Sequence, residues 1–181
     1  KRWIEGKPNF RNIDPMISVH EPSWSTGKHT MWTSFLSGGK ISFIPKQSHL
    51  FEINRLVHPE RAVFVPFQAR ELYSMYLDFF EKEQNRLARY SNKPEVISDQ
   101  AEANAIYYVH EYLLGGNVQQ ITVGGAAVST EILTFLKKLP CNIAESYGQT
   151  ESRGLLRNGY PQRGMQLKLV SLPEMGYSVD D

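Results

Sequence analysis

The sequence is poor in cysteine, and this narrows the setting in which it can work. Cys141 is the only cysteine among 181 residues, so no disulfide can form within the chain. A chain without disulfides is typical of a reducing compartment, so we expect a cytoplasmic location or one peripheral to an intracellular membrane, and not secretion. Cys141 follows Leu139 and Pro140 and opens an apolar run, which predicts a small buried residue rather than a nucleophile.

An excess of one charge and long hydrophobic runs are also lacking. Lys and Arg together number 20 and Asp and Glu 19, which gives a formal net charge of +1 and no support for a nucleic-acid partner. No apolar run approaches the ~20 residues that span a bilayer, and no charged leader opens the chain. Hydrophobic residues make up 41% of the sequence, which is the composition of a folded domain. The oligomeric state stays open.

Three motifs for nucleotides, metals and hydrolysis are missing. Residues 25–30 contain a Gly-Lys pair, but a P-loop needs glycine where Pro22 stands and Ser or Thr where His29 stands. We therefore predict a turn or a helix start there. The five histidines have no metal-ligand spacing, and no Gly-x-Ser-x-Gly elbow occurs.

What the sequence does contain is an alternation of short apolar runs with longer amphipathic segments. Strands are expected at 14–19, 40–44, 61–65, 120–123 and 142–145. Helices are expected at 23–37, 48–57, 68–89, 98–114 and 129–139. This order predicts an α/β fold with a mostly parallel sheet and crossover helices, in one domain or part of one. The tail from 153 to 181 is expected to be mostly loop and short strand.

Open α/β sheets bind ligands beyond the carboxyl ends of their strands, and two segments stand at such places. The first runs from Thr122 to Ser129 with the sequence Thr-Val-Gly-Gly-Ala-Ala-Val-Ser. Its small residues allow a flat ligand to come close, and the helix that follows favours negative charge. A tight strand-to-helix turn without any ligand is the alternative interpretation.

The second segment runs from Glu145 to Glu151 and combines an aromatic ring, a glycine, a hydroxyl and a carboxylate. Tyr147 can stack on a base or pack in the core. Thr150 can donate a hydrogen bond to a phosphate oxygen or cap a turn. Glu151 can hold Mg²⁺ or lie in solvent. The residue types alone leave these alternatives open.

The run Tyr147-Gly148-Gln149-Thr150-Glu151 matches the Tyr-Gly-x-Thr-Glu motif of the adenylate-forming superfamily, which includes acyl-CoA synthetases, luciferases and peptide-synthetase adenylation domains. Residues 124–129 are similar to the Gly-Ala-Ala-Pro-Leu-Ser segment of that family. Three further stretches, 16–21, 38–43 and 167–177, resemble other parts of it, the last as in long-chain acyl-CoA synthetases. The chain thus resembles an internal part of the large N-terminal domain, over residues 14–177.

The resemblance implies roles for individual residues. Tyr147 would stack on adenine, Thr150 would contact phosphate, Glu151 would hold Mg²⁺, and His20 would lie near the acyl carboxylate. The catalytic residues would be Thr150, Glu151 and His20. The nucleotide site would consist of Gly124, Gly125, Ala126, Glu145, Ser146, Tyr147, Gly148, Gln149 and Thr150.

The implied reaction has two steps. A fatty carboxylate attacks ATP in the presence of Mg²⁺ and gives an acyl-adenylate and pyrophosphate. The thiol of CoA then displaces AMP and gives a thioester. The partners are therefore small molecules: a fatty acid, ATP and CoA.

The sequence also departs from the family pattern. Residues 1–181 contain no Ser/Thr/Gly-rich phosphate loop, no recognisable ribose-binding aspartate and no lid domain with its lysine. Val128 stands in place of the usual proline, and residues 21–24 are unusual. We expect a partial AMP-binding domain that is inactive alone. The alternatives are a non-catalytic relative that binds nucleotide or acyl chains as an interaction module, and an unrelated α/β protein with chance matches.

Overall fold

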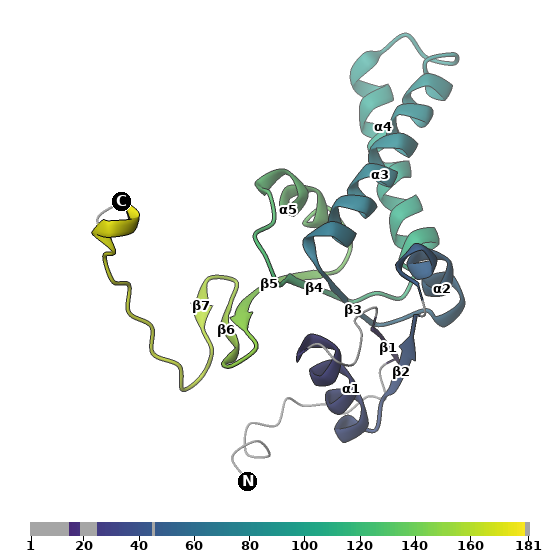
Figure 1. Ribbon diagram of the computed structural model, residues 1–181. Helices are drawn as coiled ribbons and strands as arrows, with labels where there is room; N and C mark the ends of the chain where they lie inside the picture. Colours follow the sequence, from purple (N-terminus) through teal and green to yellow (C-terminus); the bar gives the residue numbers. More distant parts are fainter. Residues whose placement is uncertain (1–14, 19–24, 45, 180–181) are drawn as a thin grey trace.

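The fold is built on a seven-stranded sheet (Figure 1). The computed structural model describes residues 15–18, 25–44 and 46–179. The strands are β1 (Pro15–Ser18), β2 (Lys40–Phe43), β3 (Arg61–Phe64), β4 (Gln120–Gly124), β5 (Asn142–Gln149), β6 (Arg153–Arg157) and β7 (Tyr160–Pro161). Their order is β2-β1-β3-β4-β5-β6-β7, with parallel pairing from β2 to β5 and antiparallel pairing beyond it. The expected α/β fold with a mostly parallel sheet is confirmed.

Helices provide the crossovers between the parallel strands. They are α1 (Ser25–Ser37), α2 (Leu50–Val57), α3 (Pro66–Leu87), α4 (Pro94–Tyr108) and α5 (Thr130–Leu136). Short turns of helix add Gln47–His49, Val109–Leu113 and Pro173–Met175. The Gly-Lys pair near residue 27 lies in the first turns of α1, as the sequence predicted. In the described part of the chain, no helix combines the length and the apolar character that crossing a bilayer requires.

The strand order reverses at β1, and the two predicted motifs lie further along the sheet, on β4 and β5. The crossover from β1 leads outward to β2, whereas the later crossovers lead the other way through β3, β4 and β5. Because such crossovers are right-handed, α1 must lie on the opposite face from α3 and α5, and Figure 1 shows this arrangement. Ligands of open α/β sheets bind outside the carboxyl ends of the strands near such a reversal.

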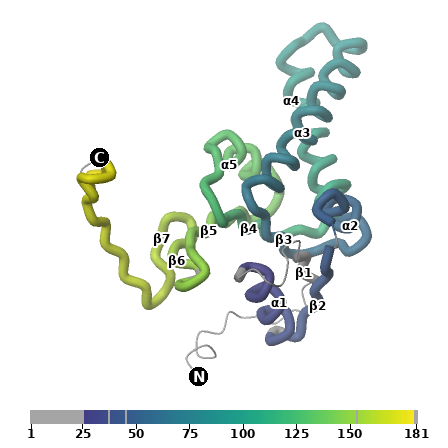
Figure 2. Tube along the Cα trace, in the orientation of Figure 1, coloured from purple at the N-terminus to yellow at the C-terminus, as the bar shows by residue number. Residues whose placement is uncertain are grey.

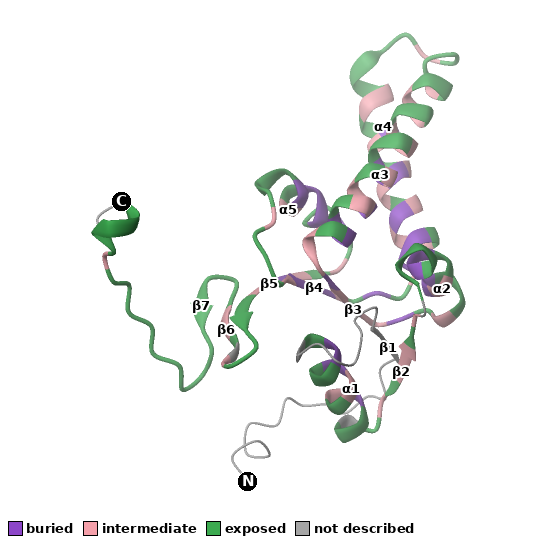
Figure 3. Ribbon diagram, viewed as in Figure 1, coloured by how far each residue is buried: buried purple, intermediate pink, exposed green. Residues whose placement is uncertain are grey.

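The core lies between the sheet and the helices α3 and α5, which cover one of its faces. Phe64, Ile121 and Val123 of the sheet are almost fully buried there, and Leu72 of α3 and Leu136 of α5 close the core from the helical side. In Figure 3 the buried residues gather where these elements meet, and the segment that follows β7 is exposed along most of its length. Burial on this face anchors the strands whose carboxyl ends carry the candidate site.

A long helical hairpin projects from this core. The tube in Figure 2 shows α3 and α4 running side by side away from the sheet. Aromatic stacking joins them, since the rings of Phe79 and Tyr108 lie 4.2 Å apart and nearly parallel. Proline at the first position of α4 moves its start to Pro94, four residues before the predicted start, because proline favours that helical position.

The C-terminal tail beyond β7 leaves the body of the sheet (Figure 2). Up to residue 179 it contains one short helical turn and one isolated bridge, between Leu172 and Tyr177. With β6 and β7 before it, the region from 153 onward has the mixture of loop and short strand that the sequence predicted.

Candidate functional site

Backbone geometry requires both glycines of the turn between β4 and α5. Gly124 lies opposite Ser146 in the parallel pairing of β4 with β5. A Cβ atom on Gly124 would lie 2.3 Å from the main-chain oxygen of Ser146, so no side chain fits there. Gly125 has a φ of +92°, a conformation that residues with side chains rarely adopt. The tight-turn interpretation therefore explains both glycines without a ligand.

The same turn nevertheless leaves a smooth, exposed surface at the strand ends. Gly125, Ala126 and Ala127 are exposed, and Val128 is half-buried against the core. Ser129 begins α5, where its Oγ accepts a hydrogen bond of 3.4 Å from the N–H of Ile132. Because α5 has only seven residues, its N-terminus offers little help to an anion. The surface of small residues is the feature that a flat ligand can use.

The strand that carries the second motif is longer than the sequence predicted. The strand was expected to end near Glu145, with the motif in a bend directly after it. In the structure β5 continues to Gln149, and the bend comes at 150–152 before β6. β5 is longer because β6 pairs with it beyond the end of β4, with Gln149 opposite Arg153. A register shift between Tyr147 and Gly148 interrupts this pairing.

The side chains of the second motif are open to solvent. Tyr147 is 62% exposed, which excludes the alternative of a ring packed in the core of the described structure. Thr150 and Glu151 are exposed in the bend between β5 and β6. The two motifs lie on neighbouring strands at one edge of the sheet, because Gly124 pairs with Ser146. The pairing thus places residues 124–126 beside 145–147, whereas Thr150 and Glu151 follow the end of β5 and His20 lies outside the described residues.

Sequence reasoning missed Gln68, a fully buried polar residue at the same edge. Its Oε1 accepts a hydrogen bond of 2.9 Å from the N–H of Val65, just after β3, while its Nε2 has no hydrogen-bond partner among the described residues. Val65 adjoins the glycine turn, since a Cβ on Gly125 would lie 3.7 Å from Val65 Cγ1. Proline at the first helical position and glutamine two residues later form a capping pattern that the sequence displays.

The residues present fit a metal only in part. Within the described ranges, no group of three or more His, Cys, Asp or Glu side chains could hold a metal ion. Glu151 offers a single exposed carboxylate. Mg²⁺ is commonly bound by one or two carboxylates together with substrate phosphates, so this arrangement fits magnesium that arrives with a nucleotide.

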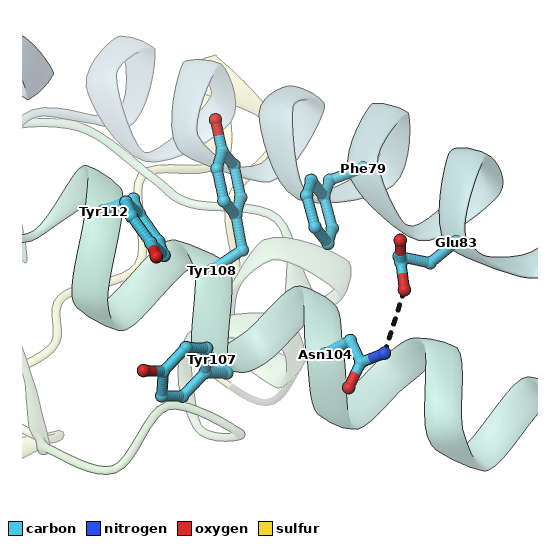
Figure 4. A pocket seen from close by; sticks show the side chains of 6 residues that line it. All are labelled: Phe79, Glu83, Asn104, Tyr107, Tyr108 and Tyr112. Atoms are coloured by element: carbon cyan, nitrogen blue, oxygen red, sulfur yellow. Dashed lines mark hydrogen bonds between the residues drawn. The ribbon is translucent and has the colours of Figure 1, made fainter. Parts of the chain in front are cut away.

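A hollow on the α3–α4 hairpin lies away from the two motifs. It measures about 370 Å³ and is lined by Phe79, Glu83, Asn104, Tyr107, Tyr108 and Tyr112 (Figure 4). Glu83 accepts hydrogen bonds from Arg86 and Asn104, which occupy its carboxylate, and these bonds, that from Arg86 first, hold its pKa below the ordinary value. Phe79 stands thirteen residues beyond the start of α3, roughly 20 Å along the helix from the strand ends.

Cys141 behaves as the sequence predicted. Its thiol is half-buried beside the core, and burial raises its pKa to about 11. A thiol with such a pKa is neutral at physiological pH and is a poor nucleophile.

Comparison with known proteins decides the family. A model of the family described as "AMP-binding enzyme" matches residues 3–180. The chain belongs to this AMP-binding, adenylate-forming family. Its fold is accordingly that of part of the N-terminal domain of adenylate-forming enzymes, and the resemblance stated from the sequence is confirmed at the level of the superfamily.

The similar proteins do not confirm the finer expectation of a long-chain acyl-CoA synthetase, because those that match most of this chain are carboxylic acid reductases. Carboxylic acid reductase from Mycobacterium tuberculosis is 29% identical over 97% of this chain. The A domain of carboxylic acid reductase from Segniliparus rugosus, solved with AMP and a co-purified carboxylic acid, superposes with a TM-score of 0.74 and 29% identity over 93% of this chain. Long chain acyl-CoA synthetase 7, peroxisomal, from Arabidopsis thaliana is 31% identical, but over only 38% of this chain.

The chain corresponds to a small part of these relatives. It spans 15% of the length of the mycobacterial reductase and 26% of the solved A domain.

Proposed function

We propose that the parent protein activates a carboxylic acid with ATP, and that this chain provides part of the adenine and phosphate site. The observation that carries the proposal is the position of the two motifs. The exposed ring of Tyr147 and the small residues 124–126 lie at one sheet edge, joined by the pairing of Gly124 with Ser146. This is the edge at which open α/β sheets bind ligands.

Each side chain has a role that its exposure permits. The ring of Tyr147 offers a face to adenine, and the backbone of residues 124–126 forms a surface on which the base can lie. Thr150 can donate its hydroxyl proton to a phosphate oxygen. Glu151 can bind Mg²⁺, which offsets negative charge on the phosphates when it is bound. His20 is proposed to contact the acyl carboxylate on the basis of the family resemblance alone.

The chemistry follows from these contacts. A carboxylate oxygen attacks the α-phosphorus of ATP, and pyrophosphate leaves with the electron pair of the broken bond. The product is an acyl-adenylate, which a thiol then attacks with release of AMP. The protein mainly positions the reactants and stabilises charge in such a reaction.

Two routes are possible for the acyl group in the second step. Similarity over 93–97% of this chain to carboxylic acid reductases favours a parent that passes the acyl group toward reduction. The partial match to long chain acyl-CoA synthetase 7 favours a fatty acid substrate and CoA as the thiol. The product formed by the full-length parent, an aldehyde or an acyl-CoA thioester, distinguishes the two.

A non-catalytic relative that only binds nucleotide or acyl chains stays a prediction, because the unusual residues 21–24 lie outside the described structure. We also propose a reducing compartment for the parent, on the basis of its lone cysteine.

The test is carboxylate-dependent exchange of pyrophosphate into ATP by the full-length parent. We expect Glu151→Gln to lower kcat about 100-fold or more, because one electrostatic contact to the transition state is lost while the exposed site keeps its fold. Glu174→Gln is the matched control, since Glu174 is also exposed but lies in the tail. Equal rates in Glu151→Gln and wild type would remove Glu151 from the site, and a parent without exchange would remove the proposal.

A further inference from the structure

The turn between β6 and β7 consists of two residues with left-handed backbones. Asn158 has a φ of +52° and Gly159 a φ of +80°, and they connect Arg157 at the end of β6 to Tyr160 at the start of β7. Asn-Gly with two positive φ angles is the preferred pair for a tight hairpin. Because Arg157 pairs with Ser146, the chain enters this turn opposite Glu145.

Asn158 holds the main chain of Glu145 with two hydrogen bonds. The N–H of Asn158 donates to the carbonyl oxygen of Glu145 at 2.9 Å. The N–H of Glu145 donates to the side-chain Oδ1 of Asn158 at 2.7 Å. Two residues of an antiparallel pair exchange the same two bonds through their main chains alone. Here a side-chain oxygen takes the place of one main-chain carbonyl.

These two hydrogen bonds lie next to the part of β5 where its pairing with neighbouring strands is interrupted. The pairing of β5 with β6 shifts register between Tyr147 and Gly148, so the regular ladder is interrupted directly beside the aromatic ring. On the other side, β4 ends at Gly124, opposite Ser146. The two hydrogen bonds of Asn158 therefore hold β5 at Glu145, just before its pairing with β6 shifts register and its pairing with β4 ends.

We infer that Asn158 is a positioning residue of the nucleotide site, because its side-chain oxygen fixes Glu145 and so sets the place of the Tyr147 ring. The inference rests on the proposed function. Only a short side chain that tolerates a left-handed backbone and carries an acceptor oxygen can serve here, which limits the position to asparagine or aspartate. Asn158 contacts no substrate itself and acts through the strand.

The experiment measures KM for ATP and kcat for pyrophosphate exchange in the full-length parent. Asn158→Gly keeps the left-handed turn but removes the acceptor, and we expect KM for ATP to rise about three- to tenfold, as for a lost hydrogen bond, with kcat changed less. Asn158→Asp keeps the acceptor and the turn and should restore most of the affinity. Hydrogen exchange of the segment 142–149 should be faster in Asn158→Gly and close to wild type in Asn158→Asp.

Gly159→Ala separates positioning from turn stability. Alanine at a φ of +80° strains the same turn, whereas the side chain of Asn158 is retained. A KM effect in Asn158→Gly that exceeds the effect in Gly159→Ala supports the inference. Equal effects of the two variants on KM, or a wild-type KM in Asn158→Gly, overturn the inference. As long as the wild-type parent exchanges pyrophosphate, either of these results leaves the proposed function intact. No exchange in the wild-type parent overturns both.

Discussion

At the scale of single residues, the site depends on how closely two backbones approach. Gly124 on β4 and Gly154 on β6 both approach Ser146, and the two glycines differ in the space around them. A Cβ on Gly124 would lie 2.3 Å from the Ser146 oxygen, whereas a Cβ on Gly154 would lie 3.7 Å from Ser146 Oγ, an ordinary contact.

These distances predict different effects of the same Gly→Ala substitution on stability. Gly124→Ala should lower the free energy of unfolding by about 2–3 kcal/mol, because the strands must separate to admit the methyl group. Gly154→Ala should change it by less than about 1 kcal/mol. Denaturant unfolding of the two variants measures the difference. A Gly124→Ala variant as stable as Gly154→Ala would contradict the close approach of β4 and β5.

Tyr147 gives a prediction about binding rather than stability. Tyr147→Ala in the full-length parent should weaken ATP binding about tenfold, because stacking of a base on an aromatic ring is lost. Tyr147→Phe keeps the ring and should keep the affinity. Tyr90→Ala is the control, since Tyr90 is even more exposed but lies in the turn just beyond α3, away from the strand ends. An unchanged dissociation constant for ATP in Tyr147→Ala would assign the ring another role.

At the scale of elements, α4 is tied to α3 and α5 through one carboxylate. Glu102 of α4 accepts hydrogen bonds from Lys138, just beyond α5, and from the Tyr76 hydroxyl of α3 at 3.2 Å. The Lys138 ammonium is the main cause that lowers the pKa of Glu102 below its ordinary value of 4.5. Burial and the Glu102 charge raise the pKa of Tyr76 to about 12, so its hydroxyl remains a donor at physiological pH.

The sign of the pH dependence follows from this lowered pKa. Between the pKa of folded Glu102 and 4.5, the unfolded chain binds more protons than the folded chain, so the contribution of Glu102 to stability is present above pH 4.5 and is lost on acidification. In Lys138→Met, this loss of stability on acidification should be smaller. The fall in Tm between pH 6 and pH 3 should shrink by about 1–3 °C, because the ion pair is half-exposed. Lys137→Met, which removes a neighbouring charge, is the control. An identical acid dependence in both variants would contradict a specific Glu102–Lys138 pair.

At the scale of the whole molecule, we propose that the chain holds only part of a site. It spans 26% of the solved A domain, and within the described ranges no group of three or more His, Cys, Asp or Glu side chains could hold a metal ion. Apolar side chains such as Trp32, Phe35 and Leu169 are exposed, as on surfaces that contact further protein. We expect no measurable pyrophosphate exchange from the 181-residue chain alone under conditions in which the parent is active. Exchange by a chain shown by circular dichroism to be folded would contradict this expectation.

The sequence by itself determined the order of strands and helices and the two motifs, because hydrophobic periodicity, glycine and proline act over short distances along the chain. It did not reveal that β5 runs on to Gln149, that Tyr147 is exposed, or that Asn158 holds Glu145 from the next hairpin. Tertiary structure decided these features, because each depends on pairing with β6, and whether a segment is strand or bend is settled by the partner that takes up its backbone hydrogen bonds.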